Sequence, residues 1–175
     1  MSDYGEFPEQ GSVRFRRVLP GPIERVFEFL TDSELRGTWF ASGALEPRVG
    51  GNLTLRFNHT DFAPKDEPVP AKFAQHAAGG HTSTGRVTRW DPPKAFAFQW
   101  DESEVVFELE SRGDDVELVL THRLLPNRAE LLDVSAGWHS HLDVLRSVLR
   151  GEPVKAFWTR IELLEKEYDK RIPPE

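Results

Sequence analysis

The order of hydrophobic patterns along the chain predicts an α+β domain, in which a curved antiparallel sheet wraps around one long helix near the end. Three observations support this class. Alternating apolar and polar residues, typical of strands, recur between residues 84 and 124. An apolar stripe at helical spacing follows over 131–149. Two short helical patterns stand in tandem soon after the first strand, which is an uncommon arrangement.

The first half of the chain contains one strand, two short helices and a second strand. Residues 13–19 alternate as a strand, which Pro20-Gly21-Pro22 stops. Pro22 suits the first position of a helix, where its missing N–H costs nothing. Helical patterns follow over 23–30 and 33–39, and a strand is expected over 53–57.

The second half is expected to form a meander of strands followed by the long helix. Each strand has one apolar face and one largely polar face, which indicates a sheet that is covered on one side only. The expected strands cover residues 85–90, 96–100, 105–110 and 116–124. The covering helix carries the apolar stripe of 131–149 and is expected to end at Gly151.

The chain divides into one domain with two attached segments. Residues 1–11 are interpreted as a flexible N-terminal arm and 12–151 as a single domain. A loop insert at 58–81 is unusually long, and such loops are commonly functional or mobile. The tail, 152–175, carries an apolar stripe at helical spacing, so we expect a helix packed on the domain or on a partner, including a second copy in a homodimer.

Composition argues against several classes of partner. The net charge of -7 opposes phosphate backbones and anionic membranes, so neither nucleic acid nor a membrane is expected as a partner. No cysteine is present among the 175 residues, which excludes disulfides and thiolate chemistry. The first residues have no basic and apolar pattern of a signal peptide. We therefore expect a soluble protein of the cytoplasm.

Several motifs in order resemble a known family. They are Gly50-Gly51 before a strand, Gly85-Arg-Val-Thr-Arg-Trp-Asp91-Pro92-Pro93, Phe98-Gln-Trp100, Val105-Val-Phe107-Glu-Leu109, Leu118-Val-Leu-Thr-His122 and Gly137-Trp138. Together they resemble the family named after the C-terminal domain of the activator of the heat-shock-protein-90 ATPase (AHSA-type), which has bacterial members. That family belongs to the START/SRPBCC superfamily, with the helix-grip fold of birch pollen allergen. The resemblance covers 12–151 and implies a cavity between the sheet and the long helix.

Large aromatic residues converge on this expected cavity from both walls. The candidate ligand-binding residues are Trp39, Phe40, Phe57, Phe98, Trp100, Phe107, His122, Trp138, His141, Leu142 and Leu145. In the simpler alternative these side chains only fill a core. His122 and His141 are the polar groups expected on the inner surface, and each bonds either a ligand or the backbone and water, because an unpaired buried imidazole is costly.

Three functions follow, because the helix-grip fold hosts lipid carriers, polyketide cyclases and stress-related binders. The first is a protein that binds an apolar or aromatic small molecule. The second is an enzyme of the cyclase or dehydratase type, with His122 and His141 as acid and base. The third is a chaperone-associated stress protein. This hypothesis is the weakest, because the activator that names the family has a separate N-terminal domain and we expect none in this chain. Binding without catalysis is favoured, so no catalytic residue is assigned.

No metal site and no cofactor are predicted. His139 and His141 stand two apart on the long helix, so their side chains point about 200° from each other and cannot share an ion. The loop residues that could cluster match no known ligand spacing; they are His59, Asp61, His76 and His81.

Overall fold

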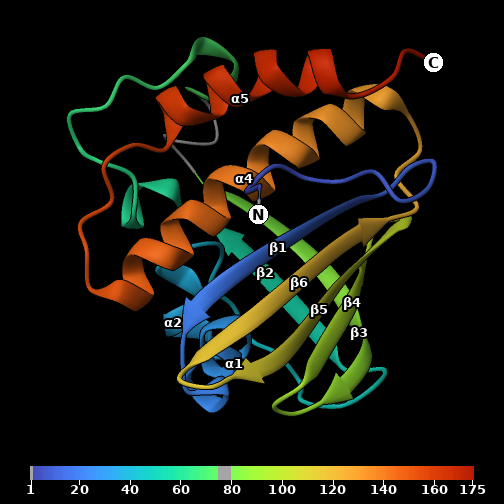
Figure 1. Cartoon of the computed structure of the whole chain (residues 1–175), viewed down its shortest axis with the longest axis vertical. Helices are drawn as coiled ribbons and strands as arrows, with labels where there is room; N and C mark the ends of the chain where they lie inside the picture. The colour runs from blue at the N-terminus through green and yellow to red at the C-terminus, as the bar shows by residue number, and fades with distance from the viewer. Residues whose placement is uncertain (1, 75–79) are drawn as a thin grey trace.

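The computed structural model describes residues 2–74 and 80–175, and in it a six-stranded antiparallel sheet curves around one long helix (Figure 1). The strands lie in the order β1-β6-β5-β4-β3-β2. The strands and main helices are β1 (Val13–Pro20), α1 (Ile23–Thr31), α2 (Ser33–Gly37), β2 (Asn52–Phe57), β3 (His81–Asp91), β4 (Ala95–Trp100), β5 (Ser103–Arg112), β6 (Asp115–Arg123), α4 (Arg128–Arg150) and α5 (Trp158–Arg171). The predicted α+β class and the predicted order of elements are confirmed.

Two elements begin earlier than their sequence patterns indicate. β3 starts at His81 rather than at residue 85, because its first residues pair with the end of β2. α4 starts before residue 131, because the Asn127 side chain caps it by accepting a hydrogen bond from the backbone N–H of Glu130. Gly151 ends α4 with φ of +70°, a conformation that glycine adopts without strain.

Two sides of α4 are buried, whereas the sequence predicted one stripe. Trp138, Leu142 and Leu145 of the predicted stripe are buried in the core. α5 lies along α4 on the side away from the sheet (Figure 1), so His139 and Ser140 are buried as well. Of the two arrangements expected for the tail, the structure therefore shows a helix docked on its own domain.

Part of the N-terminal arm, which the sequence suggested to be flexible, contacts the domain. Glu6 and Arg14 of β1 exchange two backbone hydrogen bonds of 2.8 Å. The backbone N–H of Gly5 donates to the Tyr168 hydroxyl of α5 at 2.8 Å, and the Tyr4 ring stands edge-on to the same Tyr168 ring. These contacts come from β1 and from α5, which is far away in the sequence.

The sequence predicted a long loop insert at 58–81. Residues 75–79 of this insert lie outside the described residues. Its described part includes two short 3-10 turns, η1 (His59–Asp61) and η2 (Ala71–Phe73). Phe62 is buried, with its ring centre 5.0 Å from that of Phe157 just before α5. The described part of the insert thus lies against the start of the tail helix.

Glu67 joins the insert to α5 by capping the first turn of that helix. Its carboxylate accepts hydrogen bonds from the backbone N–H groups of Phe157, Trp158 and Thr159 at 2.8–3.1 Å, and another from the Thr159 hydroxyl at 2.6 Å. Partial burial opposes its ionisation, but these donors outweigh that effect and lower the Glu67 pKa. A carboxylate at a helix N-terminus also meets the positive end of the helix dipole.

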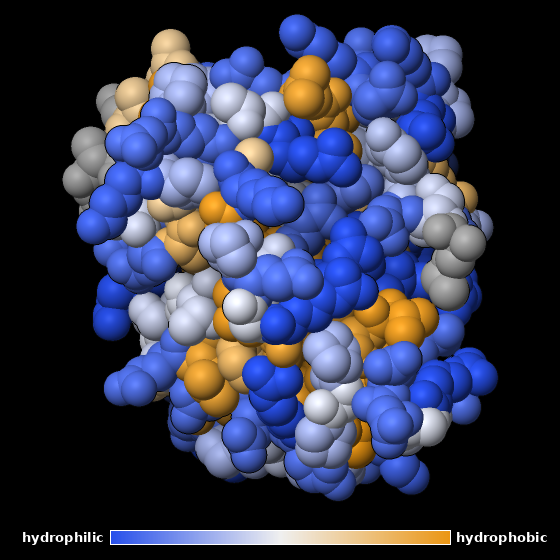
Figure 2. All heavy atoms as spheres, turned by 60° about the vertical axis from the view of Figure 1, so that its left-hand side comes forward, coloured by the Kyte–Doolittle hydropathy of each residue, from blue (hydrophilic) through white to orange (hydrophobic). Residues whose placement is uncertain are grey.

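The molecular face that includes the insert is mostly hydrophilic, and apolar side chains surface on it in separate places (Figure 2). No helix within residues 2–74 and 80–175 is long and apolar enough to cross a membrane.

Candidate functional site

The structure places the eleven predicted ligand-binding residues in the core between the sheet, the short helices and α4, and we call this set the aromatic grip. Phe40 stands at its centre, with its ring stacked on Trp138 at 4.7 Å and edge-on to Phe57 at 5.0 Å and to His141 at 5.2 Å. Ten of the eleven side chains are buried, and Trp100 is partly exposed. The sequence therefore identified residues that meet in space.

Three rings of the aromatic grip form a row across the inner face of the sheet. Phe57 of β2 and Trp100 of β4 lie nearly parallel, 13° apart, with ring centres at 5.7 Å. The ring of His122 in β6 is likewise nearly parallel to that of Trp100, with planes 13° apart and ring centres at 6.0 Å. Offset parallel packing of this kind suits the charge distribution of flat rings. The row ends where β6 leads into α4.

A hollow of about 480 Å³ opens beside this end of the row. Its walls come from the start of β3, the turn between β4 and β5, and the connection from β6 into α4. The lining residues are His81, Ser83, Trp100, Asp101, Glu102, Ser103, His122, Leu125, Pro126, Glu130 and Val134. Of the eleven predicted residues, Trp100 and His122 line this hollow, whereas the other nine pack elsewhere in the aromatic grip.

His122 uses both ring nitrogens within the protein. The indole N–H of Trp138 donates to its Nδ1 at 3.0 Å. The Ser103 hydroxyl lies 2.7 Å from its Nε2 and donates its own proton to the Trp100 carbonyl at 2.8 Å. Ser103 must then accept from Nε2–H, which assigns the neutral tautomer protonated at Nε2. Burial lowers the pKa of His122 to about 4, so the ring is uncharged at neutral pH.

His141 is also held neutral, on the insert side of the aromatic grip. Its Nδ1 lies 2.7 Å from the backbone carbonyl of Trp39, which makes that nitrogen the donor. Burial, with a smaller contribution from nearby His59, lowers the His141 pKa to about 3. The Trp138 ring stands between His141 and His122, at 6.4 and 6.3 Å from them. The two histidines therefore do not form a directly bonded acid–base pair.

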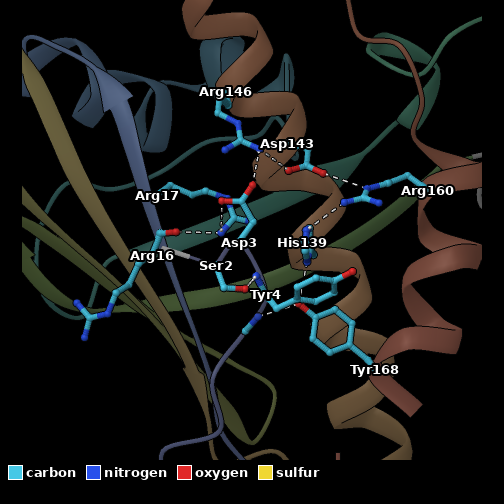
Figure 3. Close-up of polar contacts among 11 residues, drawn as sticks. Ser2, Asp3, Tyr4, Arg16, Arg17, His139, Asp143, Arg146, Arg160 and Tyr168 are labelled. Atoms are coloured by element: carbon cyan, nitrogen blue, oxygen red, sulfur yellow. Dashed lines mark hydrogen bonds and ion pairs between the residues drawn. The ribbon is translucent and has the colours of Figure 1, made fainter. Parts of the chain in front are cut away.

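A second group of polar residues, partly buried, lies between the N-terminal arm, β1, α4 and α5, and we call it the charged cluster (Figure 3). Arg17 of β1 is buried, and its Nη1 lies 3.9 Å from the carboxylate of Asp3. Arg146 of α4 bonds the same carboxylate at 2.9 Å and Asp143 at 3.1 Å, and Arg160 of α5 reaches Asp143 at 3.3 Å. The Nε and Nη2 atoms of Arg17 have no hydrogen-bond partner among the described residues.

His139 sits at the centre of the charged cluster, and sequence reasoning missed its role. Its Nδ1 lies 2.8 Å from the Tyr168 hydroxyl, and Arg160 approaches its Nε2 at 3.4 Å (Figure 3). Burial first, and then the charges of Arg17 and Arg160, lower the His139 pKa to about 3. The signal in the sequence was Arg17, a charged residue in register with the apolar face of a strand.

The loop residues weighed as metal ligands are not brought together as a site in the described residues. His59 stacks on the Phe157 ring at 5.2 Å, and His81 lies along the Phe57 ring at 6.1 Å. His76 lies outside the described residues. Within residues 2–74 and 80–175, no three potential ligands stand close enough to hold a metal ion.

The curved sheet, the two short helices after β1 and the long helix across the sheet define a helix-grip protein of the START/SRPBCC class, as predicted. Residues 20–150 match the family described as "Activator of Hsp90 ATPase homolog 1-like protein". The chain belongs to this family, and the resemblance noted in its motifs is confirmed. No curated protein matches the chain in sequence.

Solved structures extend the likeness beyond the family region. A protein from Bordetella parapertussis is 38% identical with a TM-score of 0.83, covering 99% of this chain and 93% of its own. The tail and the insert therefore fall within the aligned length. CalU16 from Micromonospora echinospora (23% identity, TM-score 0.67, 91% and 86% covered) and the Aha1 dimer from Colwellia psychrerythraea (17%, 0.59, 79% and 95%) share the fold.

Proposed function

We propose that the protein binds an apolar or aromatic small molecule at the hollow beside Trp100 and His122. The observation that carries this proposal is the junction of the hollow with the stacked row of the aromatic grip. At about 480 Å³ the hollow matches the size of ordinary small-molecule sites, and Trp100, Leu125, Pro126 and Val134 form the apolar part of its lining. Trp100 is partly exposed there, so a ligand ring has an aromatic surface to contact.

The predicted residues divide into two roles under this proposal. Trp100 and His122 contact the ligand, because they line the hollow. The other nine form the packed floor behind them, which a larger ligand reaches only if rings such as Phe40 and Phe57 change rotamer. Stacked rings hold the floor in place, so a small flat ligand that stays in the hollow costs the protein less rearrangement.

The geometry favours binding over the cyclase or dehydratase alternative. A general base needs a nitrogen with a free lone pair within reach of the substrate. In His122 the Nδ1 lone pair already accepts from Trp138, and the Nε2 proton already points to Ser103. Acid–base chemistry at this ring would first have to break one of these hydrogen bonds.

The neutral dye N-phenyl-1-naphthylamine tests the proposal, because its fluorescence rises in apolar sites. We expect the wild type to bind it with a dissociation constant in the micromolar range, about −8 kcal/mol. Trp100→Ala removes the exposed ring and is expected to weaken binding at least about tenfold, or about 1.4 kcal/mol. Trp90→Ala is the matched control, because Trp90 is also partly buried but does not line the hollow. A wild type that binds no dye would contradict the proposal.

A further inference from the structure

We infer that the hollow takes aromatic molecules that carry a protonated amine and rejects those that carry a carboxylate or another anionic group. The inference rests on the proposed function and names the ligand class of that same site. It depends on the distribution of charge around the hollow, which is independent of the aromatic contacts.

The lining of the hollow carries fixed negative charge without fixed positive charge. Its carboxylates come from Asp101 and Glu102, in the turn between β4 and β5, and from Glu130 in the first turn of α4. No lysine or arginine is among the lining residues, although the chain has 22 of them. His122 adds no charge at neutral pH, because burial lowers its pKa to about 4.

The two arginines that flank the lining in sequence are engaged elsewhere. Arg123, next to His122, pairs with Glu104 at 2.7 Å. Arg128 pairs with Asp169 at 2.9 Å and donates to the backbone carbonyls of Ile172 and Pro173 near the chain end. In the part of the chain that the structure describes, no ion pair neutralises the three lining carboxylates.

The start of α4 does not reverse this preference. A helix N-terminus attracts anions through its unpaired N–H groups and its dipole. Here the Asn127 side chain already accepts the N–H of Glu130, and the Glu130 carboxylate itself lies in the first turn. An anionic ligand would therefore face carboxylates across a small hollow, whereas an ammonium group gains from them and from the nearby Trp100 ring.

A pair of ligands with one ring system and opposite charge tests the inference. 1-Naphthylmethylammonium and 1-naphthylacetate each compete with N-phenyl-1-naphthylamine for the wild-type protein in low salt. We expect the ammonium compound to bind at least about tenfold more tightly, and added salt to reduce this ratio. Glu102→Gln with Glu130→Gln should bring the ratio within about threefold of one. The ratio of the two charged ligands is the readout, because any effect of the variant on the hollow itself changes both affinities together.

The matched control neutralises two exposed carboxylates on α1, at the opposite end of the molecule (Figure 1). Glu24→Gln with Glu28→Gln changes the net charge equally and should keep the wild-type ratio. Naphthylacetate binding as tightly as the ammonium compound would overturn the charge preference and leave the proposed function standing. An unchanged ratio in the Glu102/Glu130 variant would overturn it as well. If the wild type does not bind even the neutral dye, the proposed function fails and the inference fails with it.

Discussion

The aromatic grip and the charged cluster both bury histidines of the same domain, but their ring nitrogens have different kinds of partner in the two regions. In the aromatic grip, His122 has a neutral partner on each ring nitrogen. In the charged cluster, His139 lies among arginines, and two nitrogens of Arg17 have no partner among the described residues. Dense ring packing surrounds the first, whereas ion pairs that reach the surface surround the second.

This difference indicates that the two regions do different work. The aromatic grip buries large apolar side chains, which is the main source of stability in a domain. The charged cluster joins the N-terminal arm, α4 and α5 through Asp3, Asp143 and Arg146 (Figure 3). Its pairs are partly exposed, so each is worth little, and its role is to fix how the segments dock.

Trp138→Ala should have the largest effect, because it removes the ring that stacks on Phe40 at the centre of the aromatic grip. The indole is buried, stacks on Phe40 and holds His122 through its N–H. We expect a loss of about 3–5 kcal/mol in the free energy of unfolding, as for other large aromatic deletions in cores. Chemical denaturation measures it.

Trp138→Phe separates the two contributions of that side chain. Phenylalanine keeps an aromatic ring at this position but removes the donor to His122, and the unpaired nitrogen should cost about 1–3 kcal/mol. The smaller volume of the phenyl ring adds a packing loss to this cost. A loss below about 1 kcal/mol for Trp138→Ala would mean that the ring borders empty space rather than a packed core.

Acid should destabilise both regions through their neutral histidines. The folded-state pKa values of His122, His139 and His141 are lowered to about 4, 3 and 3, below the ordinary value of 6.5 in the unfolded chain. The unfolded chain therefore binds more protons between these values, and stability is full above pH 6.5 and falls as the pH drops toward 4 and 3. The free energy of unfolding measured against pH gives the slope.

A single substitution assigns part of that slope to the charged cluster. His139→Gln removes one of the three protons and should flatten the slope between pH 6 and pH 4 by about one third. If wild type and His139→Gln show the same slope of unfolding free energy against pH, His139 has the same pKa in the folded and the unfolded protein, which contradicts this prediction.

Arg17→Met should have the smallest effect, although Arg17 is buried. Two of its nitrogens have no hydrogen-bond partner within residues 2–74 and 80–175, so the charge gains little from its site. Asp3 is 43% exposed and keeps Arg146 at 2.9 Å, so no buried charge is left alone. We expect a change of less than about 1 kcal/mol in the free energy of unfolding. Arg146→Met, which releases both Asp3 and Asp143, should cost more; the reverse order would mean that Arg17 organises the cluster.

Local patterns predicted most of the fold, because apolar residues repeat at the spacing typical of a strand or of a helix within each element. Alternation located the strands of the meander, and the stripe through Trp138, Leu142 and Leu145 located the inner face of α4. The second buried side of α4 was missed because His139 and Ser140 are polar. Their burial depends on contacts with α5 and the residues just before it. The spacing of apolar residues within α4 cannot indicate that another part of the chain covers this side.

Of the eleven residues predicted for the site, Trp100 and His122 line the hollow, and the other nine residues of its lining were not predicted. The sequence identified the residues of the aromatic grip, because inward positions follow from the period of each element. It could not show that Phe40 fills the centre, since ring orientation depends on tertiary packing. The lining carboxylates, such as Glu102 and Glu130, were missed because they lie in a turn and at a helix start, where no apolar pattern marks an inward side.

The hydrogen bonds of Glu67 have a consequence for how this chain can change over evolutionary time. A carboxylate in the loop after β2 completes the first turn of a helix that begins about 90 positions later. A shortened loop would leave that helix start without its cap, and a lost helix would leave a carboxylate without its donors. We therefore expect relatives either to have both the long loop and the tail helix or to lack both.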